Sequence, residues 1–112
     1  MVADCIFCRI IRKEMPAKII YEDAEALVID DIYPKAPIHK LIIPKKHIAT
    51  INDFTETDDR LLMHLFRIVK KTAQEEGIAE EGYRVIANCN HQGGQAVFHV
   101  HFHLLGGKLL PW

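Results

Sequence analysis

The 112-residue chain contains 14 basic and 15 acidic residues, a formal net charge of -1, and 49% hydrophobic and 26% charged residues. This size and composition suit a single globular domain over residues 1–112, and the near-zero charge excludes the basic field that nucleic-acid binding needs. No apolar run is long enough to span a membrane, and the first residues lack the regions of a signal peptide. We expect a cytoplasmic protein that binds neither nucleic acid nor membrane.

The first expected element is a short helix over residues 4–12. Its apolar residues recur at helical spacing, and they are Ile6, Phe7, Ile10 and Ile11. Asp4 is placed to cap the first turn, and Met15-Pro16 ends the segment because the residue before a proline avoids the helical region.

Two short apolar runs, residues 18–22 and 26–30, are expected to form a β-hairpin around the polar connection Glu22-Asp23-Ala24-Glu25. Prolines at positions 34 and 37 indicate a loop over residues 30–37. A third strand is expected over residues 39–44, where Pro44 ends the strand or places it at the edge of a sheet.

One long helix is predicted from Thr57 to Gly77. Thr55, Thr57 or Asp58 can cap its start, and Gly77 suits the left-handed residue that follows a helix. Apolar residues at steps of three and four form a stripe that can pack on a sheet: Leu61, Leu62, Leu65, Phe66, Val69 and Ala73.

Two further strands are expected near the end of the chain. Residues 83–88 form the first, and a connection over residues 90–95 leads to the second, which carries the histidine-rich stretch 99–105. About five strands, hairpin-length connections, one long helix and one short helix predict an α+β domain with an antiparallel sheet.

His99, His101 and His103 alternate with apolar residues along this last strand. A strand has a period of two, so all three imidazoles should lie on one face while Val100 and Phe102 enter the other. Histidine is a poor core filler because each buried ring needs two hydrogen-bond partners. The triple alternation therefore favours a metal site or a reaction over ordinary polar residues on a half-exposed strand.

The central ring is the natural nucleophile. A neutral imidazole attacks phosphorus well and leaves well afterwards, so it can split one difficult displacement into two easier ones. His101 can attack an α-phosphate in line if a backbone carbonyl holds its other nitrogen and thereby fixes the tautomer. His103 is then placed to hydrogen-bond phosphate oxygens or to shuttle a proton.

Several motifs resemble the histidine-triad (HIT) superfamily and, in order and spacing, its Hint branch. They lie at residues 5–11, 31–39, 43–48, 93–95 and 99–105, and together they cover nearly the whole chain. Members of this branch are small homodimers that hydrolyse adenosine phosphoramidates and related adenylates. The resemblance implies a five-stranded sheet that joins a partner's sheet, a purine nucleotide substrate with an AMP-type product, and hydrolysis through a covalent histidine nucleotide.

The resemblance also implies roles for individual residues. His39 would lie beside the triad and tune it, although a polar residue that opens a strand is the alternative reading. Asn88 and Gln95 match phosphate contacts, and Asp31 matches the acceptor of the ribose hydroxyls. Ala96 replaces a hydroxyl residue of several Hint proteins, so one donor worth on the order of 1 kcal/mol is absent. The apolar slot for the base is matched by Ile6, Phe7, Ile10, Ile29 and Ile32.

Cys5 and Cys8 form a Cys-x-x-Cys pair, which in a reducing compartment indicates metal or redox work. A redox pair would normally follow a strand, and none is expected before Cys5; two reduced thiols packed as small hydrophobes remain an alternative. In zinc-bearing relatives the positions of His47 and His99 supply two further ligands, which implies a closed, structural tetrahedral zinc site. Cys89 has no partner at ligand spacing and is expected to be structural.

Trp112 is the only tryptophan and the last residue. A tryptophan at a chain terminus exposes a large apolar surface to water unless another part of the protein or a partner covers it. In the Hint branch a tryptophan at the matching distance crosses the dimer and helps to form the partner's substrate pocket. The resemblance therefore implies that Trp112 packs on a second subunit and shapes the selectivity for leaving groups.

Two other functions stay open beside the phosphoramidase. One is a dinucleoside polyphosphate hydrolase, against which the Cys-x-x-Cys opening and the short chain argue. The other is a non-catalytic module that binds a nucleotide or zinc, against which the intact triad with Asn88 and Gln95 argues.

Overall fold

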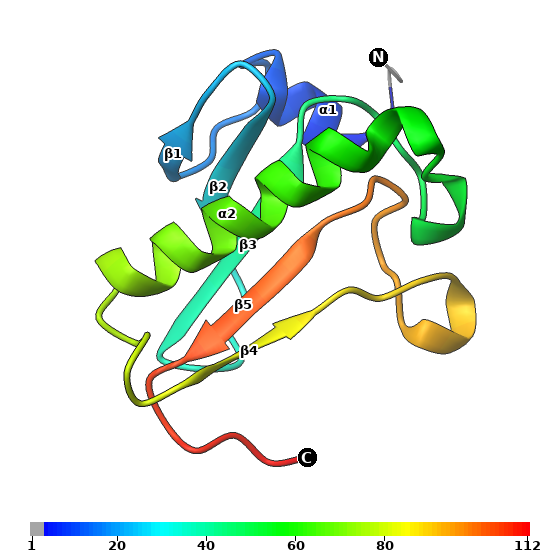
Figure 1. Ribbon diagram of the computed structural model, residues 1–112. Coiled ribbons are helices and arrows are strands. Elements are labelled where there is room, and N and C mark those ends of the chain that lie inside the picture. The colour runs from blue at the N-terminus through cyan, green and yellow to red at the C-terminus, as the bar shows by residue number, and fades with distance from the viewer. Residues whose placement is uncertain (1–3) are drawn as a thin grey trace.

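The computed structural model describes residues 4–112, which form a five-stranded antiparallel sheet with the order β1-β2-β3-β5-β4 and a helix on each face (Figure 1). In chain order the elements are α1 (Ile6–Ile11), β1 (Ile19–Glu22), β2 (Ala26–Asp30), β3 (Ile38–Pro44), α2 (Asp59–Glu75), β4 (Tyr83–Ile86) and β5 (Phe102–Gly106). The predicted α+β class, with one long and one short helix, is confirmed.

The sheet carries one apolar layer on each face, because neighbouring residues of a strand point to opposite sides. The layer under α2 contains Val28, Ile42, Phe102 and Leu104 together with Leu65 of the helix. The layer under α1 contains Leu27, Ile29, Leu41 and Ile43. The two helices therefore cover opposite faces, and the histidines on the α1 side are separated from α2 by the sheet.

The short helix begins later than the sequence indicates, because its N-cap is Cys5 and not Asp4. Cys5 has extended backbone angles, and its Sγ accepts from the backbone N–H of Cys8 at 3.4 Å. Asp4 lies one residue too early for its carboxylate to serve the first turn. The cap brings both cysteines of the pair to the same end of α1.

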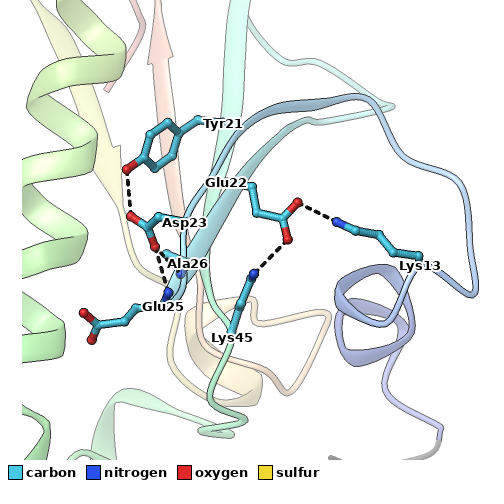
Figure 2. A network of polar contacts seen from close by, with 7 residues as sticks. All are labelled: Lys13, Tyr21, Glu22, Asp23, Glu25, Ala26 and Lys45. Carbon is cyan, nitrogen blue, oxygen red and sulfur yellow. Dashed lines mark hydrogen bonds and ion pairs between the residues drawn. The ribbon is translucent and has the colours of Figure 1, made fainter.

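The predicted hairpin is present, and its turn is held by Asp23 (Figure 2). The Asp23 carboxylate accepts from the backbone N–H groups of Glu25 and Ala26 and from the Tyr21 hydroxyl. The neighbouring Glu22 carboxylate pairs with Lys13 and Lys45, which ties the hairpin to the residues after α1 and after β3 (Figure 2).

Pro44 is the last residue of β3 and ends it, so the alternative of an edge strand does not apply. β3 pairs with β2 on one side and with β5 on the other, which makes it the central strand. A proline is accommodated there because the missing N–H falls at the end of the ladder.

The long helix α2 starts at Asp59, two residues later than predicted, after a 3-10 turn over Glu56–Asp58. Thr55 caps that turn, with its backbone N–H donating to Asp58 at 3.0 Å. Gly77 follows the helix with φ of +74°, as predicted. Among residues 4–112, no helix combines the length and the hydrophobicity of a membrane span.

The predicted apolar stripe of α2 is wrong at Phe66, which is 46% exposed. Its ring lies 5.0 Å from that of Phe102, at the flank of the contact between helix and sheet. Ile68 and Thr72 are buried instead, beside Leu65 and Val69. Several rows of a helix surface satisfy steps of three and four, and the angle at which α2 crosses the sheet selects among them.

β4 ends at Ile86 and β5 begins only at Phe102, so both strands are shorter than predicted. Of the three histidines in the 99–103 stretch, only His103 lies inside a regular strand. The expected alternation of faces nevertheless holds before the strand begins. Val100 joins Phe102 in the core under α2, whereas the rings of His99 and His101 lie edge-on against Phe7 of α1.

Candidate active site and metal centre

Two groups of imidazoles lie along the α1 face of the sheet, and Phe7 lies edge-on to one ring of each group. The His101 ring lies 5.0 Å from His103, and the His103 ring lies 5.2 Å from His39 on the neighbouring strand β3. At the other end, the His99 ring lies 4.8 Å from that of His47. The antiparallel register that pairs Leu41 with His103 brings His39 to the same side as the 99–103 stretch.

His101 has a fixed tautomer. Its Nδ1 lies 2.8 Å from the carbonyl oxygen of His99, and a carbonyl can only accept, so Nδ1 carries the hydrogen and donates. The lone pair is therefore on Nε2. Burial lowers the pKa of His101 although the bond to the His99 carbonyl opposes this shift. The geometry meets the condition that a nucleophilic central imidazole requires.

His103 and His39 share a hydrogen bond. The distance from His39 Nε2 to His103 Nδ1 is 2.9 Å, and Asp31 Oδ2 lies 3.4 Å from the same His39 nitrogen. Burial, together with the neighbouring His101 and His39, lowers the pKa of His103 to about 4. Burial also lowers the pKa of His39, against the opposing effect of Asp31. Both shifts favour the neutral ring.

A second cluster joins the start of α1 to the end of β3. The ligand atoms of Cys5, Cys8, His47 and His99 all lie within 4.8 Å of one another. Cys5 Sγ is 3.4 Å from His99 Nδ1, Cys8 Sγ is 3.3 Å from His47 Nδ1, and the two Nδ1 atoms are 3.1 Å apart. The cluster could hold a metal ion such as zinc.

The donor set fits a tetrahedral ion. Bonds of about 2.0–2.1 Å to nitrogen and 2.3 Å to sulfur place neighbouring ligand atoms roughly 3.3–3.8 Å apart, close to the separations in the cluster. His99 Nε2 lies 2.7 Å from the carbonyl oxygen of Pro44, so it is protonated and leaves the Nδ1 lone pair for the ion. Burial raises the pKa of the Cys5 thiol, and a bound cation would reverse this by stabilising the thiolate.

The side-chain amides of Gln95 and Asn88 bind backbone carbonyls. Gln95 is buried, and its Nε2 donates to the carbonyls of Ala49 at 2.7 Å and Val97 at 3.0 Å. Both donor hydrogens of Gln95 are thus in use, and a phosphate contact would have to displace one of these bonds. Asn88 Nδ2 donates to the Gly93 carbonyl at 2.7 Å. Ala96 is exposed beside Gln95.

The five apolar residues matched to a base slot differ in exposure. Ile6 is 41% exposed and Ile32 is 81% exposed. Phe7, Ile10 and Ile29 are buried in the apolar layer under α1. The match of these five residues to a base slot stays a prediction.

Comparison with known proteins identifies the fold and the family. Residues 4–110 match the family model described as scavenger mRNA decapping enzyme C-term binding. The chain is 46% identical over 110 residues to the purine nucleoside phosphoramidase of Escherichia coli (strain K12), which covers 98% of this chain and 92% of that protein. The chain belongs to the histidine-triad (HIT) family of hydrolases.

Solved structures of HIT proteins superpose closely on this one. A HIT family hydrolase from Legionella pneumophila Philadelphia 1 is 51% identical, with a TM-score of 0.96 over 97% of each chain. The histidine triad nucleotide-binding protein from Candida albicans is 34% identical, with a TM-score of 0.83 over 97% of this chain and 82% of that one.

The HIT site also uses backbone groups that sequence reasoning missed. The N–H of Lys35 donates to His39 Nδ1 at 3.1 Å, and the carbonyl of Pro44 accepts from His99. Every residue carries such groups, so no residue type marks them. The two prolines of the 30–37 loop are the only sequence signal that its backbone is held.

The C-terminal tail of this HIT chain lies beside β4. Arg84 Nη1 donates to the carbonyl of Pro111 at 2.6 Å, and its guanidinium lies 5.9 Å from the Trp112 ring. The Trp112 side chain is fully exposed within this single chain. The tail is thus tethered, but the large indole surface is not covered by its own chain.

Proposed function

We propose that this chain hydrolyses purine nucleoside phosphoramidates, or related adenylates, through a covalent nucleotide on His101. The observation that carries the proposal is the hydrogen bond from His101 Nδ1 to the His99 carbonyl, which leaves the Nε2 lone pair available to attack phosphorus. The 46% identity to a protein named purine nucleoside phosphoramidase supports the substrate class.

The reaction has two displacements. His101 Nε2 attacks the α-phosphorus, the bond from phosphorus to the leaving nitrogen breaks, and the leaving amine takes a proton from water. A water molecule then attacks the phosphorus of the histidine nucleotide, the bond from phosphorus to Nε2 breaks, and the water releases a proton to solvent. The products are the free amine and a nucleoside monophosphate of the AMP type.

We propose further that the cluster of Cys5, Cys8, His47 and His99 holds one structural zinc ion. Four protein ligands close the coordination sphere, which leaves no position for substrate or water. The ion would tie α1 to the end of β3 and would supply no chemistry to the displacement. Asp31, by its place beside His39, and Asn88, by its match to a phosphate contact of the family, are proposed contacts for ribose and phosphate.

The proposal includes a homodimer in which two sheets join into one. Strand β4 pairs only with β5, so its outer edge can accept a partner strand. The tethered tail brings the uncovered Trp112 to that edge, where a second subunit would bury it. Trp112 would then lie near the partner's leaving group.

The test is a comparison of substrates with the purified chain. Adenosine phosphoramidate, adenylyl-lysine and a diadenosine polyphosphate are incubated in parallel, and intact-mass spectrometry after rapid quenching looks for a nucleotide adduct. Fast cleavage of the first two with an adduct absent from His101→Ala supports the proposal. Preference for the polyphosphate would favour the alternative hydrolase, and tight nucleotide binding without turnover of any substrate would favour the binding module.

A further inference from the structure

The outer surface of α2 carries a row of cations. Arg60, Arg67 and Lys71 are exposed and follow one another at steps of seven and four residues, so they lie on one face of the helix. With a rise of about 1.5 Å per residue, this row is roughly 16 Å long. We call these three residues, with His64 between them, the cationic face of α2.

The cationic face looks towards the β1–β2 hairpin. His64 Nε2 lies 2.7 Å from Asp23 Oδ2, and Lys71 Nζ lies 4.4 Å from the centre of the Tyr21 ring. Figure 2 shows the side chains of Tyr21 and Asp23 directed from the hairpin towards the green helix α2. Because β1 and β4 are opposite edges of the sheet, this side of α2 lies away from the edge that the proposed dimer uses.

The three cations lack a carboxylate partner within the chain. Among residues 4–112, no ion pair includes Arg60, Arg67 or Lys71. Arg67 and Lys71 are four residues apart, a spacing at which like charges destabilise a helix. The net charge of the whole chain is only -1, so the excess of positive charge is local. An anionic partner would relieve the repulsion between these cations.

A small hollow of about 240 Å³ lies on the cationic face, and it is lined by Glu25, Arg60, Met63, His64 and Arg67. This volume is below the range of roughly 300–1,000 Å³ that pockets for small-molecule ligands occupy. Met63 is 55% exposed and gives the hollow an apolar surface. Methionine and arginine are both enriched at protein–protein interfaces. The hollow therefore suits one apolar side chain of a protein partner, flanked by two guanidinium groups.

Glu25 decides which kind of anion fits the cationic face. Its carboxylate lines the hollow and forms no ion pair within residues 4–112. A nucleic-acid strand carries a phosphate about every 3.4 Å, so its phosphates would meet Glu25 as well as the arginines. A helix with acidic residues at steps of seven and four can instead place its carboxylates opposite the cations and an uncharged residue opposite Glu25.

We propose that the cationic face of α2 is a docking surface for an acidic helical segment of a partner protein. The carboxylates of this segment pair with Arg60, Arg67 and Lys71, and one apolar side chain contacts Met63. An arginine binds a carboxylate through two parallel hydrogen bonds, so the two arginines determine the register of the segment. The sheet separates this surface from the histidines, and docking is therefore independent of the hydrolase function proposed above.

The first test measures binding of a synthetic helical peptide to the full chain. The matched peptide carries three glutamates at the steps of the three cations and a leucine opposite Met63. A second peptide of the same composition has its glutamates spread around the helix. Fluorescence anisotropy at low salt should show at least about tenfold tighter binding of the matched peptide. Amide shifts in ¹H–¹⁵N spectra should be confined to α2 and the hairpin turn. Equal affinity of the two peptides would overturn the proposal.

Substitutions then separate the cationic face from general charge. Arg67→Gln should weaken binding of the matched peptide by roughly fivefold or more, because it removes one charge-assisted pair. Lys108→Gln makes the same charge change at an exposed position outside this face and should stay within about twofold of wild type. Glu25→Gln should strengthen binding severalfold by removing a like charge from the hollow, and a gain of affinity cannot result from misfolding. Equal losses in Arg67→Gln and Lys108→Gln would contradict a specific surface.

Other anions are compared under the same conditions. Inorganic phosphate, a single-stranded oligonucleotide and vesicles containing phosphatidylserine are titrated against the wild-type chain. Each should bind more weakly than the matched peptide, because each would bring negative charge against Glu25. Tighter binding of any of the three would exclude an acidic protein segment as the occupant of this surface.

Discussion

The carbonyl oxygen of His99 lies 2.8 Å from Nδ1 of His101, so one residue connects the four-ligand cluster to the proposed nucleophile. The His99 ring faces Cys5 and Cys8 while its backbone holds His101. A cluster that holds a metal ion would therefore fix the peptide that sets the tautomer of His101. Stability of the cluster and reactivity of His101 should be coupled through this single peptide.

Substitution of the nucleophile should abolish turnover and preserve binding. His101→Ala removes the attacking lone pair, so kcat for adenosine phosphoramidate should fall by about a thousandfold or more, with nucleotide affinity within a few-fold of wild type. Steady-state kinetics and calorimetric titration with AMP measure the two quantities. Near wild-type hydrolysis would remove His101 from this role.

If the four-ligand cluster holds zinc, its loss should change both the metal content and the stability of the protein. Protein purified without chelator should contain about one zinc per chain, and Cys8→Ser should lose it with a fall in Tm of roughly 10 °C or more. The coupling through His99 predicts a lower kcat as well. Cys89→Ser is the matched control, because Cys89 lies outside the cluster. Metal-free wild-type protein with unchanged Tm would favour two reduced thiols.

The Asp23 carboxylate in the hairpin turn is expected to stabilise the fold by an amount that depends on pH. Burial tends to raise the pKa of Asp23, but bonds from Tyr21, the Glu25 and Ala26 amides and His64 outweigh it and lower the pKa to about 2. An ordinary aspartate titrates at 3.8. The ionised carboxylate therefore contributes stability in full above pH 3.8, and this contribution is lost as the pH falls towards 2.

Asp23→Asn should reduce the free energy of unfolding near pH 7 by about 1–2 kcal/mol, after allowance for the partial exposure of this carboxylate. The difference from wild type should shrink as the pH falls from 3.8 towards about 2, where half of the Asp23 carboxylates in the folded protein are protonated. Urea unfolding at both pH values measures it, with Glu80→Gln on the exposed surface as a control. A difference independent of pH would contradict the assignment to charge.

Much of the fold follows from local periodicity. The period of two correctly divides Val100 and Phe102 from His99 and His101, because the chain is extended there even before β5 begins. The exposure of Phe66 could not be predicted from the sequence. It depends on the angle at which α2 crosses the sheet, and the spacing of apolar residues does not determine that angle. The prediction that Asp4 caps α1 was wrong. Asp4 and Cys5 are neighbours and either could be the N-cap, and only the extended backbone angles of Cys5 show which residue it is.

The side chains of the candidate site could be predicted from their residue types. The backbone groups that hydrogen-bond to these side chains could not. The ligand positions 47 and 99 came from family resemblance, since 39 residues separate Cys8 from His47 and no local spacing connects them. The amide of Lys35 and the carbonyl of Pro44 set tautomers without any residue signature. Gln95 was predicted to contact phosphate, a role still untested, and its amide holds the loop in this structure.

The C-terminal tail carries the last prediction. Arg84 tethers Pro111 to the β4 edge, and the exposed indole of Trp112 follows directly, so a partner subunit docked on this edge would meet it. Removal of residues 109–112 should change the relative rates for different leaving groups more than it changes AMP binding. Arg84→Gln, which loosens the tail but keeps the indole, should shift the same ranking to a smaller extent. Light scattering should show a dimer for the full chain. An unchanged substrate ranking after truncation, or a monomeric full-length chain, would exclude a role for Trp112 across the dimer.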